Sequence, residues 1–583
     1  MTAYARRTLL LNLSIAAALA IIALASRLLF LFSSVDQKWP HSVLFEGDAP
    51  LWTDWIKAIH SGTHFEYGLP IHSPAVAHIL SILGASPATT DWTSYKILWC
   101  VCSALTCPIL YIAALRTLSG SLSAPRARSI AIIASLWFAL SFHASALATS
   151  LNGETLYTLL LVSIIALGAR PPAALPASIA TTLALGILHG LATLVRAEHT
   201  LLMLMLIAWE VAKPVTLTSG VPRGRRALLG ALAIVCSILV CLPWSIAGTR
   251  ATERMNTSAE RLPDYATLRP SWTPDARAFM DTLPPFARLD NAAYLSSIAL
   301  AAREPEINEA RVRRYFEQEF GYIPAPLKTP IFVSSQGPLC FALANHPDSG
   351  GGFSRAAFDA RFGPDPNLTF ALPSHLKLYN EGYRVGLGYI REDPAAWLSL
   401  VGQKLLRFEG GITGGLGITN APLGRALVRQ PVDVAVVPWP DALYWRIPIL
   451  ILITAGAIRL LLARRGVEWT VILLAKLVVT IAFYGYARQS ASILPALCVL
   501  AAAGLLWPID RARPARLAMC AAACIAGAIV LASDIIEYRS PRIPTIEADH
   551  DKVRPARVNA QDGAFECYAP MTIEYLPPES STP

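Results

Sequence analysis

Charged side chains are scarce in this sequence. Asp, Glu, Lys and Arg make up only 15% of its 583 residues, and hydrophobic residues make up 54%, whereas a soluble domain carries about 25% charged residues. This composition excludes an ordinary soluble protein and predicts a polytopic membrane protein. The net charge of +9 lies mostly on arginines in short loops between apolar runs, which indicates cytoplasmic loops and no nucleic-acid partner.

Two further signals are lacking, a cleavable leader and a metal-binding cysteine pattern. Arg6 and Arg7 precede an apolar run from Thr8 to about Phe32. That run exceeds the ~7–15 residues of a signal peptide's apolar region, and no small-residue cleavage site follows it. Most of the ten cysteines lie in apolar runs, and their spacing fits no zinc pattern. We therefore expect a retained first span and cysteines that pack as small apolar residues.

The sequence is rich instead in apolar runs that are long enough to cross a bilayer as helices. We predict about eleven spans, near residues 8–32, 94–116, 129–147, 154–169, 176–195, 198–213, 227–247, 443–463, 467–485, 491–508 and 516–535. The basic loops fall on one side when these spans are counted in order, which predicts a cytoplasmic N-terminus. The predicted fold class is a mainly α, polytopic transmembrane helical bundle.

Three segments fall on the external side in this scheme. The predicted domains are a transmembrane module 1–248 with a first external loop 33–93, a mixed external insert 249–441, C-terminal transmembrane helices 442–535 and an external tail 536–583. The insert has aromatic residues spaced among polar ones and is long enough to bury a small core. Cys340 and Cys567 both fall on the external side, where a disulfide persists, so they are a candidate pair.

The first external loop has an amphipathic pattern. Trp52, Trp55, Ile56 and Ile59 follow the spacing i, i+3, i+4, i+7. This pattern predicts a helix at the membrane interface, with its tryptophans at headgroup depth. A second short helix is expected after Pro74, over residues 75–80.

Polar motifs interrupt the apolar pattern in a definite order. They are Glu46-Gly47-Asp48 through His72-Ser73-Pro74, Asn152-Gly153-Glu154-Thr155-Leu156-Tyr157, Gly190 to Glu198, and Tyr486-Ala487-Arg488 running into Ile493-Leu494-Pro495. A fifth, in the insert, runs from Gly337-Pro338-Leu339-Cys340-Phe341 through Ala344-Asn345-His346-Pro347 to Gly350-Gly351-Gly352-Phe353. In this order and sidedness the chain resembles the GT-C glycosyltransferases, and within them the bacterial branch related to protein O-mannosyltransferases and aminoarabinose transferases.

The resemblance covers roughly the first 250 residues well and the remainder loosely. The family often has adjacent Asp-Glu in its first loop, whereas here Glu46 and Asp48 are two residues apart. Its second acid is often Asp, where this chain has Glu154. The resemblance implies an enzyme of the bacterial inner membrane that uses a polyprenyl-phosphate-linked sugar as donor on the external face. A divalent metal ion stays open as a cofactor.

The expected reaction assigns roles to these residues. Transfer with inversion needs a carboxylate to take the proton of the acceptor hydroxyl, and Asp48 is the first choice, followed by Glu46. The leaving lipid phosphate needs cations near the membrane surface. Arg196, Arg488 and Lys57 are the candidates for that role.

Other residues have less defined roles. Glu154, beside Asn152, would orient the acceptor, hold a divalent ion or pair with an arginine. His72, His78 and His199 are weak metal candidates, because no ligand-like spacing links them.

Structural readings compete with these roles. Asp48 precedes Ala49-Pro50 and would serve as a helix N-cap, and Glu154 would favour a helix dipole. Arg196 would pair with Glu198 or extend to the interface, and Arg488 would be an interface anchor.

Two other membrane functions compete with glycosyl transfer, and a non-enzymatic membrane scaffold stays open beside them. A secondary transporter also has acid and arginine pairs at span ends, but it often shows repeated halves, and this sequence has no evident internal repeat. A lipid-linked polysaccharide ligase or polymerase shares the substrate class but lacks the acidic first-loop motif. The sugar and the acceptor stay undetermined at this stage.

Overall fold

The computed structural model describes residues 3–33, 37–40, 48–62, 65, 69–119, 122–169, 175–214, 221–258, 263–352, 354–358, 368–415, 432–434, 443–485, 487–506 and 571–573. The chain divides into two compact units. The first comprises Met1–Lys57, Pro74–Val240 and Gly402–Pro583, and the second comprises Ala58–Ser73 and Cys241–Val401. The last predicted span, 516–535, lies outside the described residues, as do Glu46 and Cys567.

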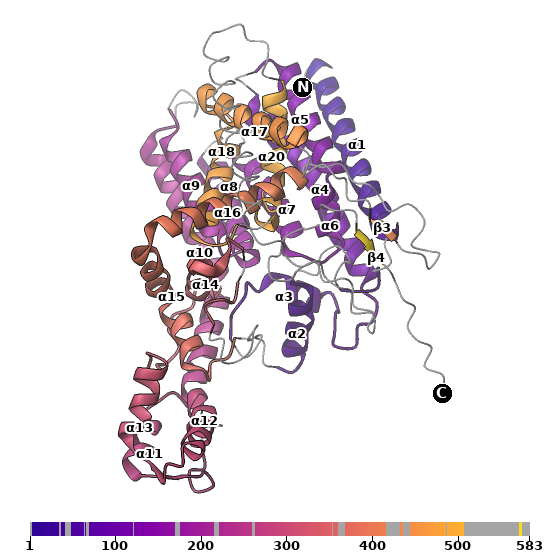
Figure 1. Cartoon of the computed structure of the whole chain (residues 1–583). Helices are drawn as coiled ribbons and strands as arrows, with labels where there is room; N and C mark the ends of the chain where they lie inside the picture. Colours follow the sequence, from indigo (N-terminus) through magenta and orange to yellow (C-terminus); the bar gives the residue numbers. More distant parts are fainter. Residues whose placement is uncertain are drawn as a thin grey trace, which may run out of the picture. The chain divides into compact units, whose positions relative to one another are not determined.

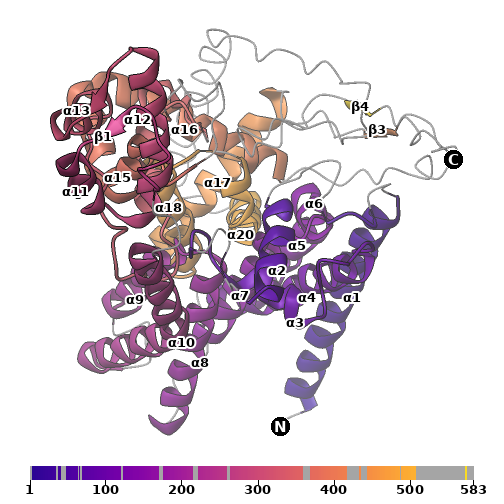
Figure 2. The same ribbon diagram turned by 90° about the horizontal axis from the view of Figure 1, so that it is seen from below.

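The first unit is built from helices (Figures 1 and 2). Its elements are α1 (Ala3–Ser33), α2 (Ala49–His60), α3 (Ala75–Ile82), α4 (Thr93–Leu118), α5 (Ala124–Leu140), α6 (Phe142–Ala148), α7 (Gly153–Gly168), α8 (Leu175–Val195), α9 (His199–Ala212), α10 (Arg223–Thr257), α16 (Pro394–Gly415), α17 (Leu443–Ala463), α18 (Val467–Ala482), α19 (Ala487–Ala491) and α20 (Leu494–Leu505). Helices α2, α10 and α16 continue into the second unit. Helix α4 packs against α1, α5 and α7, while α20 packs against α17 and α5. Strands β3 (Val432–Val434) and β4 (Met571–Ile573) form an antiparallel pair.

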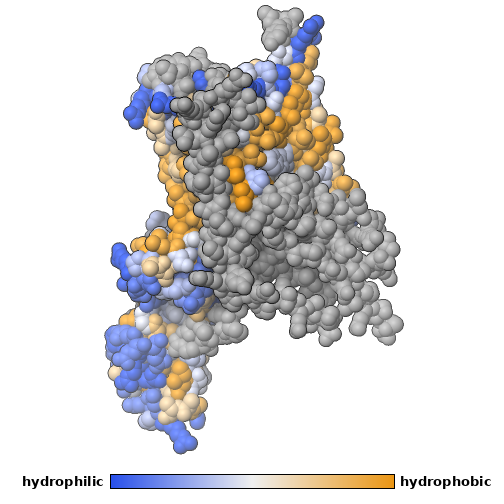
Figure 3. Space-filling model, turned by 45° about the horizontal axis from the view of Figure 1, so that its top comes forward, coloured by the Kyte–Doolittle hydropathy of each residue, from blue (hydrophilic) through white to orange (hydrophobic). Residues whose placement is uncertain are grey.

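Four of the described helices are long and apolar enough to cross a membrane. Their segments are Arg6–Phe32, Thr93–Leu118, Ala177–Val195 and Arg223–Thr257. Many leucines on α1 and α10 are exposed, among them Leu10 at 54% and Leu228 at 70%. Figure 3 shows apolar side chains gathered over the long helices on the face it displays. Such a surface suits lipid and not water, which agrees with the predicted membrane character.

Several predicted span boundaries differ from the helices of the structure. The predicted span 129–147 is two helices, because α5 ends at Leu140 and α6 begins at Phe142. The predicted span 491–508 begins later, at Leu494, after the separate short helix α19. Helix α10 continues past residue 247 to Thr257. Hydropathy marks where a chain is apolar, but it does not mark where the backbone turns within an apolar run.

A buried arginine accounts for the break after α5. Arg27 on α1 is fully buried, and its guanidinium donates to the carbonyl oxygens of Phe138, at 2.9 Å, and Ala139. These carbonyls lie in the last turn of α5, where intrahelical donors run out. A cation at this end also meets the negative end of the helix dipole. Arginines also donate to backbone carbonyl oxygens at three other helix ends. Arg116 donates to the carbonyl of Ala166 at 2.7 Å, and Arg459 donates to that of Ala503 at 2.9 Å. Arg226 donates to the carbonyls of Glu210 at 2.7 Å and Lys213 at 2.8 Å.

Glycines let helices of the first unit approach closely. A Cβ atom at Gly456 on α17 would lie 1.8 Å from the carbonyl oxygen of Leu500 on α20. A Cβ atom at Gly190 on α8 would lie 2.6 Å from the Cβ of Val240 on α10. Small residues at helix contacts are typical of packing in membranes. Gly190 therefore has a packing role within the motif that runs to Glu198.

The second unit has a small core of its own. It contains β1 (Ser271–Trp272), α11 (Pro274–Asp281), η3 (Pro285–Ala287), α12 (Arg288–Ala301), β2 (Glu306–Ile307), α13 (Glu309–Arg314), η4 (Tyr315–Glu319), α14 (Gly337–Asn345), η5 (Pro347–Ser349) and α15 (Pro373–Glu392). Strands β1 and β2 pair in parallel, with Ser271 opposite Glu306. Trp272, Met280, Leu295, Tyr315 and Phe316 are buried together in this core.

Replacing Gly456 by Ala should destabilise the first unit, because the added methyl group collides with the backbone of α20. Overpacking of this kind costs about 1–3 kcal/mol, so the melting temperature of the detergent-purified protein should fall by several degrees. Gly168→Ala is the matched control, since a Cβ at Gly168 meets nothing within 4 Å. Equal melting temperatures for the two variants would contradict the close approach of α17 and α20.

Candidate functional site

Six charged residues form one chain of ion pairs in the first unit. In order of contact they are Asp48, Arg488, Glu154, Arg196, Glu198 and Lys476. Asp48 directly precedes α2, Arg488 lies on α19, Glu154 is in the first turn of α7, Arg196 and Glu198 are in the turn between α8 and α9, and Lys476 lies on α18. Acids and cations alternate along this ion-pair chain, so every inner charge lies between two opposite charges.

Arg488 joins the first two acids. Its Nη1 donates to Oδ1 of Asp48 at 2.8 Å, and its Nη2 donates to Oδ2, so the pair is bidentate. The same guanidinium donates from Nε to Oε1 of Glu154, and Nη2 lies 3.4 Å from Oε2. The Arg488 side chain is 12% exposed and that of Asp48 is 28% exposed. The Asp48 carboxylate is thus directed to a part-buried arginine.

Arg196 continues the ion-pair chain on the other side of Glu154. It donates from Nη1 to Oε1 of Glu154, from Nε to Glu198 at 2.9 Å and from Nη2 to the amide oxygen of Gln489 at 3.3 Å. Lys476 closes the chain by donating to Oε1 of Glu198. Burying charges costs several kcal/mol each unless partners and hydrogen bonds compensate. Alternation supplies those partners, since three acids balance three cations.

Asn152 supports the Asp48 end of the chain. Its side-chain oxygen accepts from the backbone N–H of Asp48 at 3.4 Å, and its side-chain nitrogen donates to Ser150. Its backbone carbonyl accepts from Nε1 of Trp99 at 3.1 Å. Asn152 is fully buried and fixes the start of α7 against the start of α2.

The two helices expected in the first loop are present as α2 and α3, but the environment of α2 differs from the prediction. Trp52, Trp55 and Ile56 are 5%, 0% and 1% exposed. The Trp55 ring lies edge-on to His78 on α3, with centroids 5.7 Å apart. These tryptophans are therefore covered by the protein and not exposed to lipid headgroups, whereas their depth in a membrane stays a prediction. The amphipathic pattern was read correctly as a helix, but its apolar face packs inside the protein.

The histidines do not form a ligand set among the described residues. Nδ1 of His199 lies 2.9 Å from the hydroxyl oxygen of Tyr157. Nε2 of His199 lies 2.9 Å from Nδ1 of His189. Neither ring nitrogen of His199 is therefore available to a metal ion in this arrangement. His78 directs Nδ1 to the carbonyl of Pro74 at 2.9 Å, and His72 is half-buried. In the described ranges, no three His, Cys, Asp or Glu residues are grouped to hold a metal ion.

Lys57 is separate from the ion-pair chain. Its side chain is 61% exposed and its ammonium pairs with Asp54 on the same helix at 2.8 Å. The sequence motif of the insert has a structural role within the second unit. Asn345 donates to the carbonyl of Phe341 at 2.9 Å and accepts from Nε1 of Trp397 at 3.0 Å. Gly350 follows with a φ of 61°, in the left-handed region that favours glycine.

Sequence reasoning did not identify Lys476 or Gln489 as parts of the site. Lys476 carried a usable signal, because it is a lysine within the apolar run of α18. An ionisable residue inside a membrane segment is a candidate functional residue by default. Gln489 gave no such signal, because an uncharged polar residue is common at the end of any helix.

No known protein-family model matches the chain, and no curated protein sequence is significantly similar to it. Similar solved structures include the archaeal oligosaccharyltransferase AglB from Archaeoglobus fulgidus with an inhibitory peptide and a dolichol-phosphate. It shares 15% identity at a TM-score of 0.40, over 90% of this chain and 55% of that one.

The oligosaccharyltransferase of the same organism is also similar in its apo form, with 15% identity, a TM-score of 0.41 and coverage of 91% and 55%. Its complex with Zn and sulfate has 14% identity, a TM-score of 0.41 and coverage of 90% and 52%. The chain spans about half the length of these proteins. Likeness at these values decides neither the fold nor the activity of this chain.

Glu154→Gln should destabilise the protein strongly, because the substitution leaves Arg196 and Arg488 with one carboxylate fewer in a buried site. Breaking a buried ion pair from one side costs about 3–5 kcal/mol. Asp54→Asn makes the same carboxylate-to-amide change in an exposed pair, which is worth less than about 1 kcal/mol. The free energy of unfolding, measured by SDS titration, should separate the two variants, and similar losses would show that the ion-pair chain is not a buried unit.

Proposed function

We propose that the chain is an integral membrane glycosyltransferase. It transfers a sugar from a polyprenyl-phosphate-linked donor to an acceptor hydroxyl on the external face of the bacterial inner membrane, with inversion at the anomeric carbon. One observation carries the proposal. A partly exposed carboxylate, that of Asp48, pairs with Arg488, and the buried Glu154 links Arg488 to Arg196, beside helices that suit a bilayer.

Asp48 is suited to act as the base. The acceptor oxygen forms a bond to the anomeric carbon while the bond from that carbon to the phosphate oxygen breaks. The electron pair leaves with the lipid phosphate, and the acceptor proton passes to the carboxylate. Asp48 is 28% exposed, against 23% for Glu198 and 0% for Glu154. Of these three acids it is therefore the most accessible to an acceptor. Glu46 stays a second candidate for the base.

Arg488 and Arg196 are suited to bind the leaving phosphate. Guanidinium groups pair with phosphate through two parallel hydrogen bonds, and they stabilise charge best where water is excluded. Arg488 is held by Asp48 in a bidentate pair, so a donor phosphate competes with Asp48 for the same guanidinium. Donor binding would then release the carboxylate that the acceptor needs.

Glu154 is a positioning residue in this scheme. It is fully buried and accepts from both arginines, so it keeps the two guanidiniums together when a phosphate displaces Asp48. The carboxylates of Asp48 and Glu154 already accept from arginine. These contacts occupy part of the acceptor capacity of both carboxylates.

Asp48→Asn should slow release of polyprenyl phosphate from a radiolabelled polyprenyl-phospho-sugar by at least ~100-fold, the lower end of what a general base contributes. The rate is measured in reconstituted vesicles with membrane glycans as acceptors. Asp290→Asn, which alters an exposed acid of α12 in the second unit, should release phosphate at the wild-type rate. Full turnover by Asp48→Asn would refute the assignment of the base, and transport of a free solute by these vesicles would favour a secondary transporter.

A further inference from the structure

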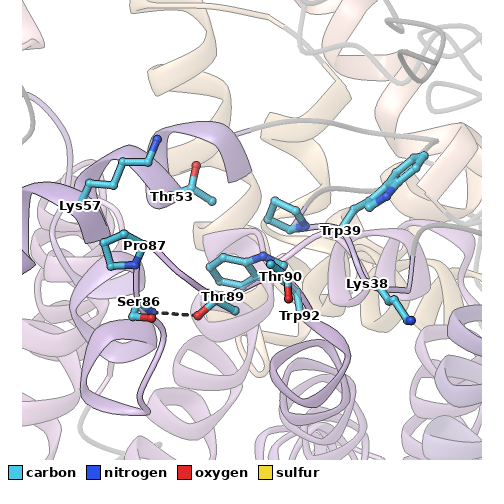
Figure 4. A pocket seen from close by; sticks show the side chains of 10 residues that line it. Lys38, Trp39, Thr53, Lys57, Ser86, Pro87, Thr89, Thr90 and Trp92 are labelled. Carbon is cyan, nitrogen blue, oxygen red and sulfur yellow. Dashed lines mark hydrogen bonds between the residues drawn. The ribbon is translucent and has the colours of Figure 1, made fainter. Parts of the chain in front are cut away.

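A pocket of about 360 Å³ opens beside α2, within the first unit and separate from the ion-pair chain. Three segments line it: residues 38–40, α2, and the loop that leads into α4. Figure 4 shows Lys57 and Thr53 of α2 on one side of the view, Trp39 and Lys38 on the other, and Trp92 between them. The volume is within the ~300–1,000 Å³ of small-molecule sites.

The apolar walls of the pocket are fixed by backbone contacts. Trp92 is 5% exposed, and its backbone N–H donates to the carbonyl of Lys38 at 3.1 Å. The Thr93 hydroxyl donates to the carbonyl of Gln37 at 3.3 Å. These two bonds tie the segment that carries Trp39 to the start of α4. The two indole groups are thus held on a preformed frame.

The polar groups of the pocket keep unused hydrogen-bonding capacity. The Thr53 hydroxyl donates to the carbonyl of Pro50 at 2.7 Å, so its oxygen is still able to accept. The Thr89 hydroxyl oxygen accepts from the backbone N–H of Ser86 at 2.9 Å, so its proton is still able to donate. Lys57 lies one helical turn after Thr53. Its ammonium group has three N–H donors, and the contact with Asp54 at 2.8 Å uses one of them.

This set of groups selects a class of ligand. Indole planes pack against the C–H faces of sugar rings, and hydroxyl groups pair with sugar hydroxyls. Lys38 and Lys57 are the charged residues of the pocket lining, so the lining favours negative charge. Their acids, Asp54 beside Lys57 and Asp91 near Lys38, stand outside the lining. A phosphate headgroup of a lipid would use the lysines but not the two indole walls. An anionic sugar uses both.

The pocket is placed to extend the proposed active site. Asp48 precedes α2, and Thr53 and Lys57 follow it at five and nine positions. At 1.5 Å per residue these positions lie about 8 and 14 Å further along the helix axis. We propose that the pocket binds an anionic sugar residue of the acceptor while an acceptor hydroxyl is at Asp48. This inference rests on the proposed glycosyl transfer, and it assigns Lys57 to the acceptor instead of the lipid phosphate.

Equilibrium dialysis tests the pocket on the full chain in nanodiscs of neutral lipid. The probes are a radiolabelled trisaccharide of glucuronic acid and the corresponding neutral trisaccharide of glucose. The acidic probe should bind at least tenfold more tightly than the neutral one. Lys57→Gln and Trp39→Ala should each weaken acidic binding at least tenfold. Lys328→Gln, an exposed lysine in the second unit, should leave binding unchanged.

Several results would overturn the inference. Equal binding of the two probes would remove the preference for charge, and unchanged binding in Lys57→Gln, which alters an exposed side chain and should fold, would place the ligand elsewhere. Loss of binding in nanodiscs of anionic lipid would make a headgroup the occupant. Asp48→Asn should bind the acidic probe as tightly as the wild type does. The dialysis result therefore does not depend on the proposed catalysis, which is tested separately by turnover.

Discussion

The alternation of charge along one buried chain of ion pairs is the constraint on which the site depends. Asp48, Glu154 and Glu198 are interleaved with Arg488, Arg196 and Lys476, and each inner residue contacts two opposite charges. Removing any one of them leaves a neighbour with too few partners in a medium that penalises unpaired charge. This requirement draws together the starts of α2 and α7, the turn between α8 and α9, and helices α18 and α19.

The same arrangement suits the ion-pair chain to the proposed reaction. Asp48 is at the exposed end of the chain, and Glu154 is at its fully buried centre. In the proposed reaction, an anion that enters from the exposed side meets Arg488 first and exchanges for Asp48, while Glu154 keeps the arginines in place. The carboxylate proposed as the base, that of Asp48, is thus paired with Arg488, which is the guanidinium proposed to bind the donor phosphate. The pocket beside α2 is proposed to add a second contact for the acceptor, on the helix that follows Asp48.

Much of this site was predictable because its residues break the apolar pattern. Asp48, Glu154, Arg196 and Arg488 were singled out as charges at the ends of apolar runs, and the structure brings all four into contact. Their mutual pairing was not predictable, since spacing in the sequence does not give distances between helices. Lys476 was not predicted because it lies within an apolar run and not in a loop, although a lysine in such a run is itself a signal.

The fold shows the same division between pattern and packing. Periodicity gave the helices at α2 and α3, but it did not show that Trp55 is buried in the protein, because an apolar stripe suits a membrane and a protein core equally. The break at Ser141 depends on Arg27, which lies on another helix and donates to the last carbonyls of α5. Long-range contacts of this kind leave no local trace in sequence.

A cryo-electron microscopy structure with polyprenyl phosphate bound would test the account most directly. The account predicts a phosphate oxygen within hydrogen-bond distance of Arg488, an Asp48 carboxylate that has left that guanidinium, and Glu154 still in contact with both arginines. A phosphate bound elsewhere, with the bidentate Asp48–Arg488 pair intact, would contradict it.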